Sequence, residues 1–406
     1  MDSSSHLPDM SMAPQFGGGV GDSQAVFAGS ANPVEIGTAS GSPLGTIAKF
    51  DTPPPSLARS ESAVRRFMLQ SAARELVPGE RVAKCLRVPA GSGVDVFYTP
   101  TMSAAHYGGL QTCGSIWMCP VCAAKISERR RIELEQALAA YDGLVVLATF
   151  TVQHRGSDAL STLLDGFLGS LRKLRLGKPW QRIESRFAVS GVIRAVEVTY
   201  GRNGWHPHAH VLFFLGPDAD VSAFGDALRS RWLGILARGG LSASWFVGVD
   251  VVVADGAAGD YVAKFGAQWT AAHEMTKASV KCGRSKGRTP AELLANYAVG
   301  GDAEAGRLWR EYALLFKGKK HLVWSRGLRA RLLPDVEDKT DEELANQHDE
   351  LAVLLATLTL SQWARVVAND ARAELLTVAA SGDREQLVSF LVRLGVDLEV
   401  VPHKIE

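Results

Sequence analysis

The chain has 406 residues, 46% of them hydrophobic, and a formal net charge of +1. This length allows two or three domains with a sizeable core. The longest apolar runs are too short to span a bilayer, and the first residues lack the pattern of a secretory signal. We therefore expect a soluble, cytoplasmic protein that does not contact a membrane.

The near-neutral total conceals a strong asymmetry in charge. Residues 261–331 contain 14 Lys and Arg against 5 Asp and Glu, whereas residues 332–406 contain 6 against 15. A basic middle followed by an acidic end indicates a polyanion-binding core and a separate appendage. Ahead of both, residues 1–57 are rich in Gly, Ser, Pro and Ala, a composition that predicts a disordered tail.

Residues 58–142 contain four of the five cysteines, three of them in a C-x5-C-x2-C array formed by Cys113, Cys119 and Cys122. Two thiolates at this close spacing can bind one tetrahedral zinc ion. We expect Cys85 to supply the fourth ligand, with His106 as the alternative. Because the array lacks a second C-x2-C pair, buried and reduced cysteines without metal remain an open interpretation. An amphipathic helix with a basic run is expected directly after the array.

From residue 143 onward the apolar pattern becomes regular and alternates between strand and helix periods. Strands are expected over 143–154, 189–200, the stretch ending at 215, and 245–254, and helices over 157–176, 221–237 and 257–269. The resulting order is β-α-β-β-α-β followed by a helix. It predicts an α+β fold in which an antiparallel sheet has the split βαβ (ferredoxin/RRM-like) arrangement, with helices on one face.

The third of these strands begins Trp-His-Pro-His-Ala-His, and its histidines occupy every second position. In an extended strand His208 and His210 project from the same face, which places two imidazoles side by side for a divalent metal. Glu197, in the preceding strand, joins that face if Tyr200 pairs with the start of this strand, and equally if Arg202 does. An odd-length loop would instead present a valine beside the histidines.

A further candidate lies one strand and one helix later, where Tyr261 and Lys264 share a face of an expected helix. On its own this spacing is common in helices, so its weight comes from its place after the histidines. The basic segment that follows could contact phosphates, or could be an ordinary solvated surface. Its candidates for DNA binding are Lys281, Arg284, Lys286 and Arg288, together with His206.

Together, three motifs resemble those of the HUH endonucleases: Thr149-Phe150-Thr151-Val152-Gln153-His154, the pair His208 and His210, and Tyr261-x-x-Lys264. The cysteine array and the later stretches 308–312 and 322–328 resemble the bacterial plasmid branch, the rolling-circle replication initiator (Rep) proteins. The resemblance covers about Cys85 to Leu328. It identifies 143–331 as an HUH catalytic domain behind a zinc module at 58–142.

The resemblance implies Mg²⁺ or Mn²⁺ held by His208, His210 and, by inference, Glu197, with structural Zn²⁺ at the cysteines. Tyr261 would nick a single-stranded or hairpin origin, leaving a 5′-phosphotyrosine and a 3′-OH primer, and Lys264 would assist. A host helicase and a single-strand-binding protein are the partners that this reaction implies. Phe265 stands where a second tyrosine would follow, so termination could use water activated by Asp260 or Asp255, although neither lies one helical turn before the tyrosine.

Rival functions fit part of the sequence. A non-catalytic, zinc-stabilised DNA-binding regulator would explain the cysteines and the basic segment but leaves the histidine strand without a role. A small-molecule metallohydrolase would not explain the basic segment, and relaxases or transposases share the HUH chemistry. Residues 332–406 are expected to form a small, acidic, helical region for contact with a host protein or for oligomerisation, and the sequence does not set the oligomeric state.

Overall fold

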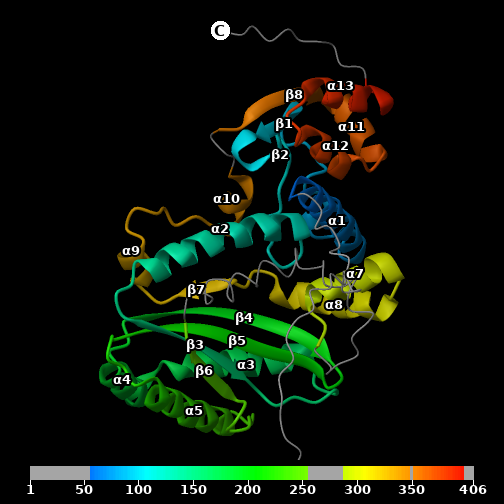
Figure 1. Cartoon of the computed structure of the whole chain (residues 1–406). Coiled ribbons are helices and arrows are strands. Elements are labelled where there is room, and N and C mark those ends of the chain that lie inside the picture. The colour runs from blue at the N-terminus through cyan, green and yellow to red at the C-terminus, as the bar shows by residue number, and fades with distance from the viewer. Residues whose placement is uncertain (1–54, 255–286, 348–350, 397–406) are drawn as a thin grey trace, which may run out of the picture. The chain divides into compact units, whose positions relative to one another are not determined.

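The computed structural model describes residues 55–254, 287–347 and 351–396, with side chains from residue 62 onward (Figure 1). All of these residues belong to one compact unit, Pro53–Glu406. The expected tail lies outside the described residues except at its end, where helix α1 (Pro55–Leu76) begins. The expected helix over 257–269 also lies outside them.

A five-stranded antiparallel sheet forms the middle of the chain, with strand order β6-β3-β5-β4-β7 (Figure 1). Its strands are β3 (Leu144–Thr151), β4 (Gly191–Gly201), β5 (Gly204–Leu215), β6 (Val249–Val253) and β7 (Leu322–Trp324). The four strands expected from the apolar pattern are all present, although β6 starts four residues later than expected. Strand β5 lies between β3 and β4, so the connection from β3 to β4 passes over one intervening strand.

The two faces of this sheet are covered by different elements (Figure 1). On one face, alternate residues such as Phe150 pack against α3 (Leu160–Leu174) and α5 (Val221–Arg238), where the Phe150 and Trp232 rings meet edge to face at 5.2 Å. On the other face, Leu147 and its neighbours pack against α2 (Pro120–Ala139) and α9 (Leu328–Leu332). Side chains alternate between faces along a strand, so this second face carries the histidines.

A two-residue turn joins β4 to β5 and sets their register. Gly201 pairs with Gly204 across Arg202-Asn203, and Gly204 has a φ of 81°, a backbone conformation that favours glycine. In this register Tyr200 pairs with Trp205 and Glu197 lies directly opposite His208. Of the two registers that the sequence left open, the structure has the one in which Tyr200 pairs with Trp205.

A second, three-stranded antiparallel sheet has the order β2-β1-β8. It contains β1 (Gly93–Thr99), β2 (Ala104–Gly108) and β8 (Val353–Thr359). The first two strands come from the cysteine-containing segment and the third from the acidic end of the chain. The expectation of a separate, helical region at 332–406 is therefore wrong for 353–359. An apolar run of this length fits a strand or a helix equally, and its pairing with β1, where Val94 lies opposite Leu358, makes it a strand.

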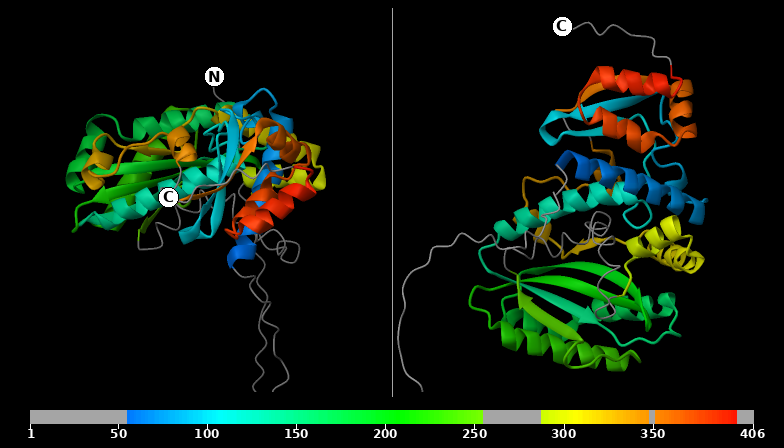
Figure 2. Two further views of the ribbon diagram at one scale, coloured as in Figure 1. Left: turned by 90° about the horizontal axis from the view of Figure 1, so that it is seen from above. Right: turned by 45° about the vertical axis from the view of Figure 1, so that its right-hand side comes forward.

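The remaining helices pack beside the two sheets and α2. Beside the first sheet lie α4 (Gly177–Arg186), α7 (Pro290–Gly300) and α8 (Ala303–Phe316). Around the second lie α11 (Leu360–Ala368), α12 (Arg372–Ala379) and α13 (Arg384–Arg393), whereas α10 (Asp341–Asn346) packs on α2. Figure 2 shows the orange and red C-terminal helices next to the cyan strands β1 and β2. Among the described residues, no helix combines the length and apolar character that crossing a bilayer requires.

Candidate functional site

The sheet face opposite α3 and α5 carries a compact group of one carboxylate and two imidazoles. Nε2 of His208 lies 2.6 Å from Oε2 of Glu197, and Nε2 of His210 lies 3.7 Å from the same oxygen. One ligand atom from each residue lies within 4.8 Å of the other two. The side chains of Glu197 and His208 are each 15% exposed and that of His210 is 6% exposed. The ligand atoms of the three residues therefore converge on one point, which is largely buried but still accessible to solvent.

The second nitrogen of each imidazole is held by a neighbour. Nδ1 of His210 lies 3.1 Å from Oγ1 of Thr149, and Nδ1 of His208 lies 3.4 Å from the carbonyl oxygen of His206. Such contacts select the tautomer and the ring orientation of a metal-binding histidine. Both Nε2 atoms are left facing Glu197, and a proton or a cation between nitrogen and carboxylate would satisfy the pair. The supporting contact from Thr149 was not anticipated, although β3 pairs Thr149 with His210.

Electrostatics keep the carboxylate of this group ionised. Burial raises the pKa of Glu197, but hydrogen bonds and charge from His208 and His210 outweigh burial and lower the pKa to about 2. Burial, together with the neighbouring His208 and His154, lowers the pKa of His206 to about 4. At neutral pH the group thus presents an anionic carboxylate, to which a divalent cation can bind, next to an uncharged His206.

His206 lies beside the group and does not form part of it. Its ring stacks on that of His154, with centroids 4.7 Å apart and planes at 17°. Of the two groups of potential metal ligands among the described residues, the one on this sheet consists of Glu197, His208 and His210. His206 and His154 thus extend the row of imidazoles toward the β4–β5 turn, where they could contact a ligand without binding the same cation.

A small cavity adjoins Glu197 on the side of β7 and α8. Its walls come from four parts of the chain: besides residues 196–198 of β4, they include Trp117, Ala291, Tyr312, Phe316 and His321. Burial and the charge of Glu197 raise the pKa of Tyr312, and burial lowers the pKa of His321 to about 4. Both side chains are therefore uncharged at neutral pH. Sequence reasoning did not assign them to the site, because no local pattern shows that α8 packs beside β4.

Most residues expected to perform the chemistry with this group fall outside the described part of the chain. They are Tyr261, Lys264, Asp255, Asp260, Lys281, Arg284 and Lys286. Arg288 is described and exchanges two backbone hydrogen bonds with Tyr200 near the end of β4, at 2.7 and 2.8 Å. Its guanidinium lies over the Tyr200 ring and 3.5 Å from Asp302. The basic segment therefore rejoins the described chain next to the strand that carries Glu197.

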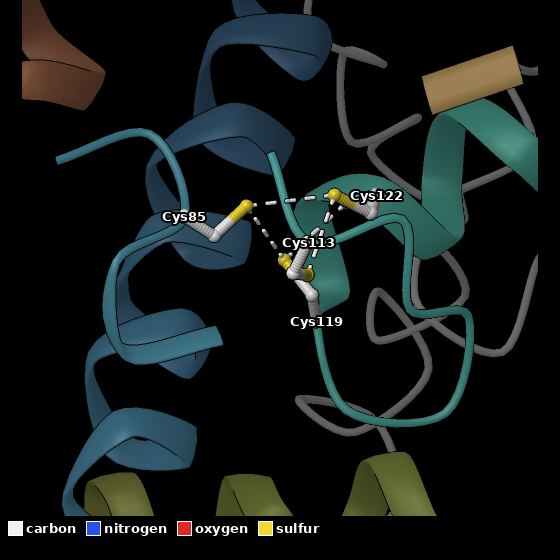
Figure 3. Close-up of side chains that lie close together, drawn as sticks. All are labelled: Cys85, Cys113, Cys119 and Cys122. Atoms are coloured by element: carbon white, nitrogen blue, oxygen red, sulfur yellow. Dashed lines mark hydrogen bonds between the residues drawn. The ribbon is translucent and has the colours of Figure 1, made fainter. Parts of the chain in front are cut away.

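A second group gathers four buried cysteines at the N-terminus of α2 (Figure 3). The Sγ atom of Cys85 lies 3.5 Å from that of Cys122 and 3.7 Å from that of Cys119, and Cys113 lies 3.7 Å from Cys122. His106, the alternative fourth member, lies in β2 with its ring stacked on Phe97. The structure thus brings Cys85 to the array.

Local geometry explains why the cysteines of the array lie close together. Cys119 is the N-cap of α2, Pro120 is favourable in the first turn, and the backbone N–H of Cys122 donates to Sγ of Cys119 at 3.5 Å. Gly114, between the first two cysteines of the array, has a φ of 58° and passes close to Glu342. Burial raises the pKa of the Cys119 thiol, so a charged thiolate there needs a compensating cation.

The spacing of the sulfur atoms fits a tetrahedral zinc ion. With Zn–S bonds of about 2.3 Å, neighbouring sulfurs of a tetrahedron lie about 3.8 Å apart. The pairs above, at 3.5 to 3.7 Å, are close to that separation. Free thiols offer only weak hydrogen bonds to one another, so the four-way approach of these side chains favours a shared cation.

The chain is similar to known replication proteins. A family model described as a replication protein matches residues 109–283. A protein rep of Streptomyces lividans is 30% identical over 333 residues, which cover 65% of this chain and 71% of that protein. A neomycin resistance protein of Streptomyces cyanogenus is 32% identical over 149 residues, 30% of this chain and 34% of that protein. No solved structure matches the chain. The extent of the match to the Streptomyces lividans protein shows that this chain belongs to the family of replication (Rep) proteins.

Proposed function

We propose that the protein initiates rolling-circle replication of a plasmid by nicking one strand of its origin at a specific site. The observation that carries the proposal is the group of Glu197, His208 and His210 on the sheet face opposite α3 and α5, in a chain of the Rep family. The strand order β6-β3-β5-β4 is that expected of a split βαβ core. This sheet, residues 143–331, is then the HUH endonuclease domain.

The donor set fits a divalent cation, because two imidazoles and one ionised carboxylate converge beside a small cavity. Mg²⁺ or Mn²⁺ bound there would polarise the scissile phosphate and stabilise the charge that develops on it. His208 and His210 contribute Nε2, and Glu197 contributes its carboxylate. Thr149 holds the His210 ring in place.

The nucleophile in this proposal is the hydroxyl of Tyr261. Its oxygen forms a bond to phosphorus while the bond from phosphorus to the 3′ oxygen breaks, so the products are a 5′-phosphotyrosine and a free 3′-OH. An unperturbed tyrosine pKa of about 10 is too high for neutral pH, and Lys264 would neutralise the phosphate or favour the phenolate. The 3′-OH primes synthesis. In termination, water activated by Asp255 or Asp260 would cleave the regenerated origin and leave a new 3′-OH. That 3′-OH would attack the phosphotyrosine, so that Tyr261 leaves and the displaced strand is closed.

The surrounding residues would hold the DNA. Arg288, which pairs with Tyr200 at the end of β4, would supply positive charge near the histidine group, and further basic residues precede it in the sequence. Single-stranded or hairpin origin DNA is the substrate class that such charges fit. Replication from the 3′-OH would then require a host helicase and a single-strand-binding protein. The cysteine cluster is proposed to hold structural Zn²⁺ through Cys85, Cys113, Cys119 and Cys122.

The decisive experiment uses the purified full chain and single-stranded oligonucleotides that tile the DNA encoding and flanking it. With Mn²⁺, one oligonucleotide should be cut and its 3′ product should remain attached to the protein on a denaturing gel. Tyr261→Phe should abolish the adduct, whereas the matched control Tyr297→Phe, whose hydroxyl contacts Glu75 on α1, should retain it. An adduct that persists in Tyr261→Phe, or cleavage that never gives an adduct, would overturn the mechanism.

A further inference from the structure

A buried chain of hydrogen bonds runs from the cysteine cluster to the acidic end of the protein. Gln70, on α1 and 2% exposed, donates from Nε2 to Sγ of Cys119 at 3.3 Å. Its Oε1 accepts a hydrogen bond from Arg372, the first residue of α12, at 3.1 Å. One amide side chain therefore contacts a sulfur of the cluster on one side and a cation of the C-terminal region on the other.

Arg372 is an unusual residue to find in this place. Its side chain is 1% exposed, and it also donates to the carbonyl of Leu86 at 3.1 Å and lies over the ring of Phe67. Its acidic neighbour is Asp370, which is 3.5 Å away and 70% exposed, so water weakens that attraction. The Nε atom of Arg372 has no hydrogen-bond partner among the described residues. A buried guanidinium is costly unless an anion compensates it.

The cysteine cluster supplies such an anion when it holds zinc. Four thiolates around one Zn²⁺ carry a net charge of −2, and N–H donors to the sulfurs reduce the cost of burying that charge. Through Gln70 the guanidinium of Arg372 lies within about 9 Å of Sγ of Cys119. At that distance in a buried environment, opposite charges still attract strongly.

We propose that Gln70 and Arg372 form a relay that positions and charge-balances the zinc site, so that zinc binding and docking of the C-terminal region stabilise each other. Two more contacts of that region fit the relay: Tyr107, on β2, donates to the carbonyl of Arg372 at 2.6 Å, and Lys125, on α2, donates to the carbonyl of Ala345 at 3.4 Å. Because such coupling is reciprocal, loss of zinc loosens α12, and loss of Arg372 weakens zinc binding.

The inference rests on the proposed zinc site, and zinc affinity tests it without DNA. Competition with a chromophoric chelator should show zinc bound about tenfold more weakly in Gln70→Leu and in Arg372→Met. Gln136→Leu on α2 and Arg393→Met on α13, both exposed side chains, are matched controls that should retain wild-type affinity. In the cobalt-substituted protein, Gln70→Leu should move the thiolate-to-metal charge-transfer band to lower energy, because a sulfur without its N–H donor releases electrons more easily.

A second measurement needs no variant and remains valid if either substitution prevents folding. Hydrogen exchange of the wild-type protein is followed with zinc bound and after zinc is removed, comparing α12 with α3 in the five-stranded sheet. Removal of zinc should increase the rate of hydrogen exchange in α12 much more than in α3. Equal deprotection of both helices, or unchanged zinc affinity in both variants, overturns the relay. Wild-type protein that binds no zinc removes the zinc site itself, and neither result bears on whether Tyr261 nicks DNA.

Discussion

The histidine group and the cysteine group differ in how the chain assembles them. Glu197, His208 and His210 come from a single hairpin, and the register of that hairpin decides whether they meet. The cysteines come from two segments of the chain, and side chains from α1 and α12 support them. One group depends on local pairing and keeps an open side, whereas the other is fully enclosed by long-range contacts. A site for chemistry needs access, and a structural site needs burial.

The largest effect should come from breaking the enclosed group. In Cys119→Ser with Cys122→Ser, zinc should be lost and the melting temperature should fall by about 10 °C or more, because binding of a structural zinc ion contributes directly to folding. Metal analysis and circular dichroism measure both quantities. Cys282→Ser, outside the array, is the control and should retain zinc. A double variant that melts like the wild type would mean that the cluster carries no structural metal.

Breaking the open group should abolish chemistry and spare the fold. His208→Ala should reduce the rate of Mn²⁺-dependent nicking by about 10³-fold or more, since a cation at this point contributes several kcal/mol to charge stabilisation. Its melting temperature should stay within a few degrees of wild type. His106→Ala, in the other sheet, provides the control. If both variants nick at the same rate, the histidine strand has another role.

The pH dependence of stability tests the charge of the histidine group. The pKa of Glu197 is lowered to about 2 from an ordinary value of 4.5. A lowered carboxyl pKa stabilises the fold above pH 4.5, and this contribution is lost as the pH falls toward 2. With metal removed, wild type should exceed Glu197→Gln by about 2 to 3 kcal/mol in unfolding free energy at pH 7. Urea titrations should show the difference shrinking below pH 4.5. A difference independent of pH would contradict the assigned charge.

The smallest effect concerns the contact that orients an imidazole. Thr149→Val keeps the shape of the side chain but removes the oxygen that lies 3.1 Å from Nδ1 of His210. Mn²⁺ affinity, measured by calorimetry, should fall about tenfold with no change in melting temperature. Thr151→Val is the matched control, because that hydroxyl donates to the carbonyl of Val247 instead. Equal losses in both variants would remove the special role of Thr149.

The same contrast explains what could be predicted from the sequence. Period-two histidines and the Arg202-Asn203-Gly204 turn are local signals, and they placed Glu197 on the histidine face in either of two registers. The structure has the register in which Glu197 lies opposite His208. Strand β8 carries no such signal, because its apolar run becomes a strand only through pairing with β1, far away in the chain. The roles of Gln70 and Arg372 could not be predicted either, because the sequence of a helix does not indicate which buried partner a polar residue contacts. Helix α4 was missed because its one buried side chain, Trp180, makes no periodic stripe.

The pairing of β8 with β1 also imposes an order on biosynthesis. The ribosome releases the five-stranded sheet before residues 353–359 emerge, so the sheet can form while the cysteine segment still lacks its third strand and the cover of α12. During that interval the thiols are open to oxidation or to the wrong metal. A nascent chain can therefore form the sheet face that carries the histidine group before it encloses the cysteine group. Premature termination would leave the histidine group formed and the cysteine group without its cover.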